Sequence, residues 1–192
     1  VCPRMSDVPQ RPQSTRPPIS RDRGFWSMVA TQFLGAFNDN FFKQLVLFLA
    51  VDHASKLGTA DIYKSVAAAL FALPFVFCSG LAGHLADRYS KRRIIVLCKV
   101  AEIAVMAAGL LVFLSFGADL LLLFVVLGLM GLQSAFFGPS KYGILPELLR
   151  PRDLPSANGV IQMTTFVAVI FGAVVAGIGK DLFQDQQVLT LI

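Results

Sequence analysis

The sequence predicts an all-α membrane protein, and three observations support this prediction. Hydrophobic residues make up 55% of the 192 residues and charged residues only 15%, whereas about a quarter of the residues in a soluble domain are charged. The apolar residues fall in long continuous blocks, unlike the weak alternating segments of a β-barrel. Short charged segments separate the blocks. We therefore expect membrane-spanning helices joined by short loops.

Residues 1–24 precede the first apolar block and are rich in proline, serine and arginine. This segment has too little apolar surface to fold, so we expect a disordered cytoplasmic tail. It has no apolar core before a small-residue cleavage site and so does not resemble a secretory signal peptide. The rest of the chain, residues 25–192, is expected to form one transmembrane bundle.

Five apolar blocks are long enough to cross a bilayer. We expect helices at about residues 25–51, 62–81, 94–116, 120–137 and 158–178. Pro74 should kink the second helix. A polar connection should follow the fourth helix, and residues 180–192 read as a loop with a candidate start of a sixth helix. Many transporters are built from six-helix halves, so we expect an incomplete N-terminal half of a longer protein.

Basic residues are concentrated in alternate loops, which predicts the orientation of the chain. The tail, the loop after the second helix and the loop after the fourth helix hold most of them, whereas the intervening loops hold few. The N-terminus should therefore be cytoplasmic in a multi-pass protein of the inner membrane. The formal net charge of +5 follows from this topology and does not indicate binding to nucleic acid.

The first apolar block contains the polar stretch from Gly35 to Lys43. At about 1.5 Å per residue, Asp39 would lie roughly 20 Å from the start of that block, near the middle of the membrane. A charged residue at that depth is costly and usually marks a transport pathway or a partner inside the bundle. We therefore treat this stretch as a candidate substrate site.

Helical spacing places Gln32, Gly35, Asp39 and Lys43 on one face, with Asn40 beside it. Asp39 and Lys43 lie one turn apart and could neutralise each other in a purely structural pair. A zwitterionic headgroup needs the same two signs, with the acid for an ammonium and the lysine for a phosphate. Both alternatives remain open at this point. The candidate substrate-binding residues are Asp39, Asn40, Lys43, Asn38 and Gln32.

The turn between the second and third helices reads Gly-His-Leu-Ala-Asp-Arg-Tyr-Ser-Lys-Arg-Arg over residues 83–93. Charge alone would make it an anchor on the cytoplasmic side, but its order of glycine, acid and bases resembles the loop signature of the major facilitator superfamily. Ser90 stands where that signature usually has glycine. The resemblance implies the N-terminal half of a major-facilitator-type bundle. It also implies a conformational latch against the second half, formed by Gly83, Asp87, Arg88, Lys91 and Arg92.

Three stretches narrow this resemblance: residues 35–43, residues 137–147 (Phe-Gly-Pro-Ser-Lys-Tyr-Gly-Ile-Leu-Pro-Glu) and residues 157–159 (Ala-Asn-Gly). Together they resemble the lysophospholipid transporter branch of the superfamily. The resemblance implies alternating-access transport of a lysophosphatidylethanolamine-like lipid across the bacterial inner membrane. The implied partners are this lysophospholipid, membrane lipids, the C-terminal half of the transporter, and an acyltransferase with an acyl-carrier-protein synthetase, which is sometimes fused. Gln162 occupies a position where relatives often carry an acid.

Two other functions are open: a general major-facilitator exporter of drugs or metabolites, and the membrane portion of a fused 2-acylglycerophosphoethanolamine acyltransferase. The acyltransferase chemistry needs a histidine followed five positions later by aspartate, but Gly58 follows His53 and Tyr89 follows His84 at that distance. We therefore expect no catalytic residue in this segment, although an enzyme domain could be fused downstream. The three cysteines and two histidines have no metal-site spacing, and we expect neither a metal nor another cofactor.

Overall fold

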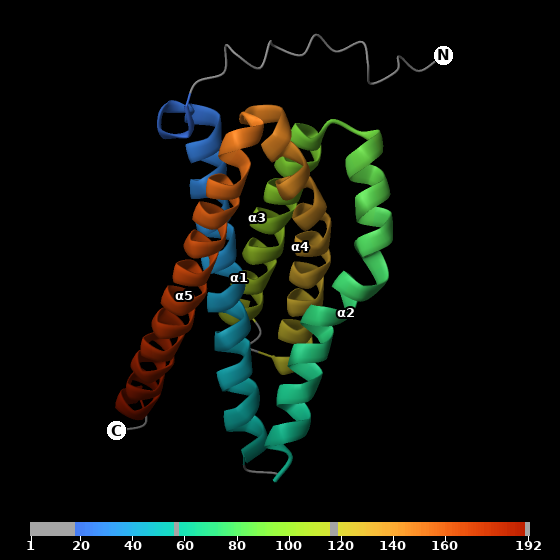
Figure 1. Ribbon diagram of the computed structural model, residues 1–192. Coiled ribbons are helices and arrows are strands. Elements are labelled where there is room, and N and C mark those ends of the chain that lie inside the picture. The colour runs from blue at the N-terminus through green and yellow to red at the C-terminus, as the bar shows by residue number, and fades with distance from the viewer. Residues whose placement is uncertain (1–17, 56–57, 116–118, 191–192) are drawn as a thin grey trace.

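The computed structural model describes residues 18–55, 58–115 and 119–190. Residues 1–17, most of the predicted tail, lie outside the described residues. Just before the bundle, residues Ile19–Arg21 form the short 3-10 helix η3. Five long α-helices follow and pack as a bundle (Figure 1). The bounds of the helices are α1 Arg23–Ser55, α2 Ala60–Arg88, α3 Lys91–Ser115, α4 Leu120–Leu148 and α5 Leu154–Thr190, with the 3-10 helix η4 (Pro151–Asp153) before α5.

The connections between the helices lie at two opposite ends of the bundle (Figure 1). The start of α1, the α2–α3 turn and the α4–α5 connection share one end, which we call the basic end because it carries most of the arginines. The α1–α2 connection lies at the opposite end, which we call the α1–α2 end (Figure 1). Neighbours in space differ from neighbours in sequence, because α1 packs mainly on α5 and α2 packs mainly on α4.

Close approach of these helices depends on glycines. A Cβ atom on Gly131 of α4 would lie 2.5 Å from the carbonyl oxygen of Phe71 in α2. A Cβ atom on Gly172 of α5 would lie 2.7 Å from the carbonyl oxygen of Phe37 in α1. Small residues at a helix interface allow such contact between backbones. Gly131 and Gly172 thus have a direct packing role.

Four of the described helical segments, α2, α3, α4 and η4–α5 to Lys180, are long and apolar enough to cross a membrane. Many of their large apolar side chains are exposed in this chain, including Phe77, Ile103 and Phe166. α1 is also long enough, but Asp39, Lys43 and the neighbouring amides lower its hydropathy. The chain is therefore an all-helical membrane bundle over its described residues, as the sequence predicts.

The helices extend beyond the apolar blocks that predict them. α2 continues to Arg88, so that the basic turn after it is reduced to Tyr89 and Ser90. α4 continues to Leu148 through Pro139 and Pro146, where the sequence predicts a polar connection. Each proline removes only one intrahelical hydrogen bond, and such losses are tolerated where neighbouring helices hold the segment. Figure 1 shows α2 bending partway along its length, as expected for the helix that contains Pro74.

Residues 180–190 also differ from the expected loop with a candidate sixth helix. Their backbone continues α5 as far as Thr190. The end of an apolar block marks where a helix leaves the membrane and not where it stops. Polar residues such as lysine and glutamine have high helix propensity and can prolong a helix into water.

Candidate functional site

Asp39 lies in the middle of α1 and faces α4. Ser134 of α4 donates a hydrogen bond of 2.7 Å from its hydroxyl to Oδ2 of Asp39. Gln133 donates in turn to the Ser134 hydroxyl at 2.8 Å. The other carboxylate oxygen, Oδ1, is buried and has no hydrogen-bond partner among the residues that the structure describes. The carboxylate therefore keeps one acceptor position open inside the bundle.

Asn38, the residue before Asp39, faces α3. Its amide nitrogen lies 3.5 Å from Oε1 of Glu102. The other carboxylate oxygen of Glu102, Oε2, forms an ion pair of 2.6 Å with the Lys99 ammonium. Lys99 and Glu102 are three residues apart on α3 and pair with each other. The pair packs against α1 at Gly35, where an added Cβ would clash with the Lys99 ammonium. Gly35 thus makes room for a charged pair beside the polar stretch.

Gln32 and Asn40 have structural partners of their own. Gln32 is buried and donates to the hydroxyl of Thr165 in α5 at 2.9 Å. Asn40 donates to the carbonyl oxygen of Ala36 one turn earlier in α1, at 2.8 Å. The amides at these two positions therefore fix α1 locally and against α5.

Lys43 points toward α2. Its ammonium lies 5.1 Å from the centre of the Phe71 ring, and no ion pair joins it to Asp39 or to another acid of the described chain. It lines a pocket of about 370 Å³ between α1 and α2, whose other charged residue is Lys64. The sequence thus correctly places Lys43 one turn from Asp39, but the two side chains have different neighbours.

A second lysine lies inside the bundle near the basic end. Lys141 of α4 is only 8% exposed, and its ammonium lies 4.6 Å from the centre of the Tyr142 ring. The neighbouring hydroxyl of Ser140 is buried without a hydrogen-bond partner. Gln162 of α5 donates to the Tyr142 hydroxyl at 3.2 Å. The sequence assigns Lys141 to a loop, so its burial is unexpected.

The predicted latch residues lie together at the basic end, where α2 ends and α3 begins. Lys91 forms a 2.7 Å ion pair with Glu147 at the end of α4. The side chains of Asp87, Arg88 and Arg92 are exposed. Gly83 lies in α2, and an added Cβ there would meet nothing in the described chain. With Arg93, which is also exposed, the turn therefore presents one acid and three arginines on the surface of this chain.

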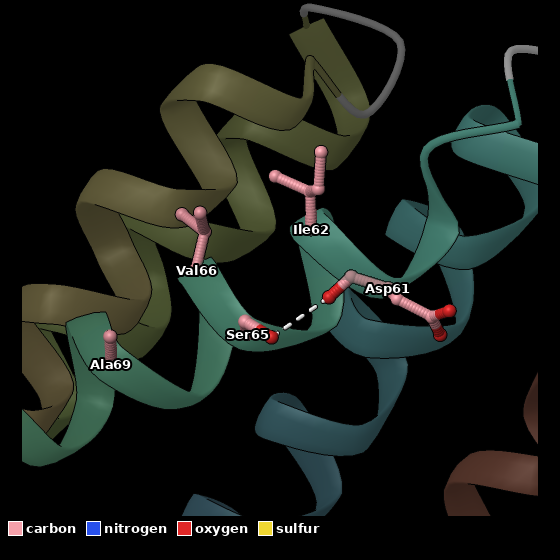
Figure 2. Close-up of a pocket in the computed structure, with 5 residues that line it drawn as sticks. All are labelled: Asp61, Ile62, Ser65, Val66 and Ala69. Atoms are coloured by element: carbon pink, nitrogen blue, oxygen red, sulfur yellow. Dashed lines mark hydrogen bonds between the residues drawn. The ribbon is translucent and has the colours of Figure 1, made fainter.

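A shallow pocket on α2 is separate from all these groups. Figure 2 shows that its lining residues, Asp61, Ile62, Ser65, Val66 and Ala69, come from successive turns of one helix. The hydroxyl of Ser65 donates to the backbone oxygen of Asp61 at 2.9 Å. The Asp61 carboxylate is already paired with Lys64 at 3.2 Å. Its lining comes from one helix and is mostly apolar, and we assign no ligand to this pocket.

The predicted site residues therefore point in different directions around α1 and do not line one common face. Gln32 faces α5, Asn38 faces α3, Asp39 faces α4 and Lys43 faces α2. Ser134 and Gln133 cannot be recognised as site residues from the sequence, because two polar residues near the end of an apolar block do not indicate which residue they contact. Among the described residues, no cluster of three histidine, cysteine or acidic side chains could hold a metal ion.

These features define a class of protein. Long apolar helices pack around α1, which carries an acid and a lysine in the middle of its length, as in helical membrane transporters. The chain belongs to the Major Facilitator Superfamily, whose sequence model matches residues 26–183. It is part of a multi-pass membrane protein.

Three similar proteins are each described as the lysophospholipid transporter LplT. The protein from Klebsiella pneumoniae subsp. pneumoniae is 28% identical over 164 residues, which cover 85% of this chain and 38% of the relative. The protein from Salmonella paratyphi B is 30% identical over 159 residues, 83% of this chain and 37% of the relative. The protein from Citrobacter koseri is 29% identical over 159 residues, which also cover 83% of this chain and 37% of the relative. This chain thus spans less than two fifths of the length of these relatives. No solved structure matches it significantly.

Proposed function

We propose that the protein to which this chain belongs moves a lysophosphatidylethanolamine-like lysophospholipid across the bacterial inner membrane by alternating access. The similarity to proteins described as lysophospholipid transporters supports this substrate class. The structural observation that carries the proposal is the Asp39 carboxylate, which has a buried oxygen without a partner. The chain would supply the N-terminal side of the transport pathway.

Asp39 would bind the ammonium of the lipid headgroup. A buried polar atom without a hydrogen bond typically costs about 1–3 kcal/mol, and more if it is charged. Ser134 satisfies only Oδ2, so a ligand that donates to Oδ1 would remove this cost. An ethanolamine ammonium has both the positive charge and the N–H donors that are needed. Ser134 and Gln133 would hold the carboxylate in place for this contact.

Lys43 would bind the phosphate of the same headgroup. It has no acidic partner in the described chain, and it lies one helical turn from Asp39. A lysine ammonium acts as a compact positive charge for phosphate. Asn38, Asn40 and Gln32 would contribute by fixing α1, through contacts to α3, to their own helix and to α5.

The orientation and the latch are part of the same proposal. The basic end carries the arginine-rich turn and would face the cytoplasm, so that all five helices span the membrane with the N-terminus inside. Asp87 is exposed there and could contact a helix N-terminus of the second half, where the dipole favours an anion. Gly83, Arg88, Lys91 and Arg92 would complete this latch. An acyltransferase partner stays a prediction from the sequence.

Replacement of Asp39 tests the proposed function. The Asp39→Asn variant of the full-length protein should insert into the membrane normally but take up little labelled lysophosphatidylethanolamine in spheroplasts. Asp119→Asn is a matched control, because Asp119 caps the start of α4 by accepting from the backbone N–H of Leu122. Full uptake by Asp39→Asn would overturn the proposed role of Asp39. Absence of lysophospholipid uptake in the wild type would favour the alternative of a general exporter.

A further inference from the structure

The pocket between α1 and α2 is distinct in its combination of apolar walls and two cations. Its lining residues are Lys43 and Leu47 of α1 and Lys64, Ala67, Ala68 and Phe71 of α2. Its volume of about 370 Å³ falls at the lower end of the range for small-molecule sites. Ala67 is buried while Lys64 and Ala68 are exposed, so the pocket extends from the surface of this chain into the helix seam.

The charge of Lys43 is only partly compensated within the described chain. Contact with the Phe71 ring offsets only part of the cost of placing a lysine in the middle of a membrane helix. No acid of the described chain pairs with Lys43. An anion bound in the pocket would lie close to the Lys43 ammonium and neutralise its positive charge. The lining residues include no acid, and the nearby Asp61 carboxylate is paired with Lys64 at the exposed edge of the pocket.

Lys64 lines the same pocket as Lys43 but at a different level along the axis of α2. It is four residues from the start of α2, and Phe71, which contacts Lys43, is seven residues further on. At about 1.5 Å per residue, these two levels of α2 are separated by roughly 10 Å. The side chains of Lys64 and Asp61 are both exposed, and ion pairs between exposed side chains contribute little to stability. Lys64 can therefore leave Asp61 for a stronger anion.

We propose that this pocket is an accessory site for the phosphate of a single-chain phospholipid at the α1–α2 end of the bundle. Lys64 contacts the phosphate first, near the membrane surface, and Lys43 receives it deeper, one turn from Asp39. Leu47 and the two alanines give the glycerol and the start of the acyl chain an apolar surface. This inference rests on the proposed function, because it places a lysophospholipid on its way to Asp39.

Site-specific photocrosslinking on α2 tests the location. A photoreactive amino acid replaces Ala68, which lines the α1–α2 pocket, or Ala69, which lines the lysine-free pocket of Figure 2. The two positions are adjacent on the same helix and face different pockets. In membranes containing the full-length protein, labelled lysophosphatidylethanolamine should crosslink at position 68 several times more than at position 69. Neutral monoacylglycerol, which lacks the phosphate, should show no such preference.

Charge variants test the two lysines. Lys64→Gln should raise the lysophosphatidylethanolamine concentration for half-maximal uptake by about tenfold, the expected effect of losing one charge-assisted hydrogen bond. The maximal rate should be kept, and Lys64→Arg should restore the affinity. Lys180→Gln is the matched control, because Lys180 is paired with Asp52 at 2.9 Å and lies outside the pocket. It should leave the half-maximal concentration unchanged.

The outcomes separate this inference from the proposed function. If the wild type transports the lysolipid but positions 68 and 69 crosslink equally, or Lys64→Gln behaves like Lys180→Gln, the phosphate site is overturned and the transport function stands. If a fatty acid without phosphate crosslinks at position 68 as strongly as the lysolipid, the pocket binds anionic chains generally and the phosphate assignment is wrong. If the wild type transports no lysolipid, the proposed function itself fails.

Discussion

Ser134 of α4 donates a hydrogen bond of 2.7 Å to the carboxylate of Asp39 in α1, although the two residues are 95 positions apart in the chain. This contact sets the rotation of α1 against α4 at the level of the polar stretch. It also leaves the second carboxylate oxygen of Asp39 without a partner. One residue therefore combines a structural contact with an open acceptor position.

Ser134→Ala should lower the free energy of unfolding, measured in mixed micelles with increasing dodecyl sulfate. Hydrogen bonds between membrane helices contribute about 0.6 kcal/mol on average. We expect a larger loss, in the range of about 1–3 kcal/mol, because both oxygens of a buried carboxylate would then be unpaired. The control is Ser65→Ala, which removes a hydroxyl bonded to a backbone oxygen on the exposed face of α2. Equal losses in the two variants would contradict the structural role of the Ser134 contact.

The Lys99–Glu102 pair should behave as a buried charge pair. Lys99→Met leaves Glu102, with its side chain only 11% exposed, without its cation, and breaking such a pair typically costs about 3–5 kcal/mol. The double variant Lys99→Met with Glu102→Leu removes both charges and should recover most of that loss. The same unfolding assay on the two single variants and the double variant gives the coupling energy. Additive losses would show that the two charges do not interact.

The sequence predicts the number and order of the helices well, because each is encoded by an apolar block of membrane length. It predicts their ends poorly. Gly138 and Pro139 follow the fourth block and favour a break, but packing of Phe137 and Ile144 on α3 and α1 holds α4 as a helix to Leu148. Local propensity is a weak guide where tertiary contacts decide the conformation.

The polar residues of α1 could be found from sequence, but their partners could not. Helical periodicity shows which residues share a face, and it correctly places Asp39 and Lys43 one turn apart. It does not show which helix each of them meets. Asp39 meets Ser134 and Lys43 meets Phe71 because α4 and α2 both pack beside α1, an arrangement set by the whole bundle.

Lys141→Met should not destabilise the protein. The Lys141 ammonium is buried over the Tyr142 ring and has no acidic partner in the described part of the chain. Methionine keeps the length of the side chain and removes the cost of burying the charge. The free energy of unfolding should therefore stay unchanged or rise, in contrast to Lys99→Met. A loss as large as that of Lys99→Met would mean that Lys141 has an anionic partner in the complete protein.

Two glycines of α5 should respond differently to the same substitution. A Cβ atom at Gly172 would lie 2.7 Å from the carbonyl oxygen of Phe37 and 3.0 Å from the amide nitrogen of Phe41, whereas a Cβ at Gly177 would meet nothing within 4 Å. Both glycines occur in small-residue pairs at a spacing of four, so the sequence alone treats them alike.

Gly172→Ala should lower the free energy of unfolding by about 1–3 kcal/mol, because backbone atoms of α1 cannot move aside as a flexible side chain would. Gly177→Ala should be neutral or stabilising by up to about 1 kcal/mol, since alanine is the better helix former. Unfolding in mixed micelles measures both variants under the same conditions. A neutral Gly172→Ala would mean that α1 and α5 are not in backbone contact, and would also place the Gln32–Thr165 hydrogen bond between the same two helices in doubt.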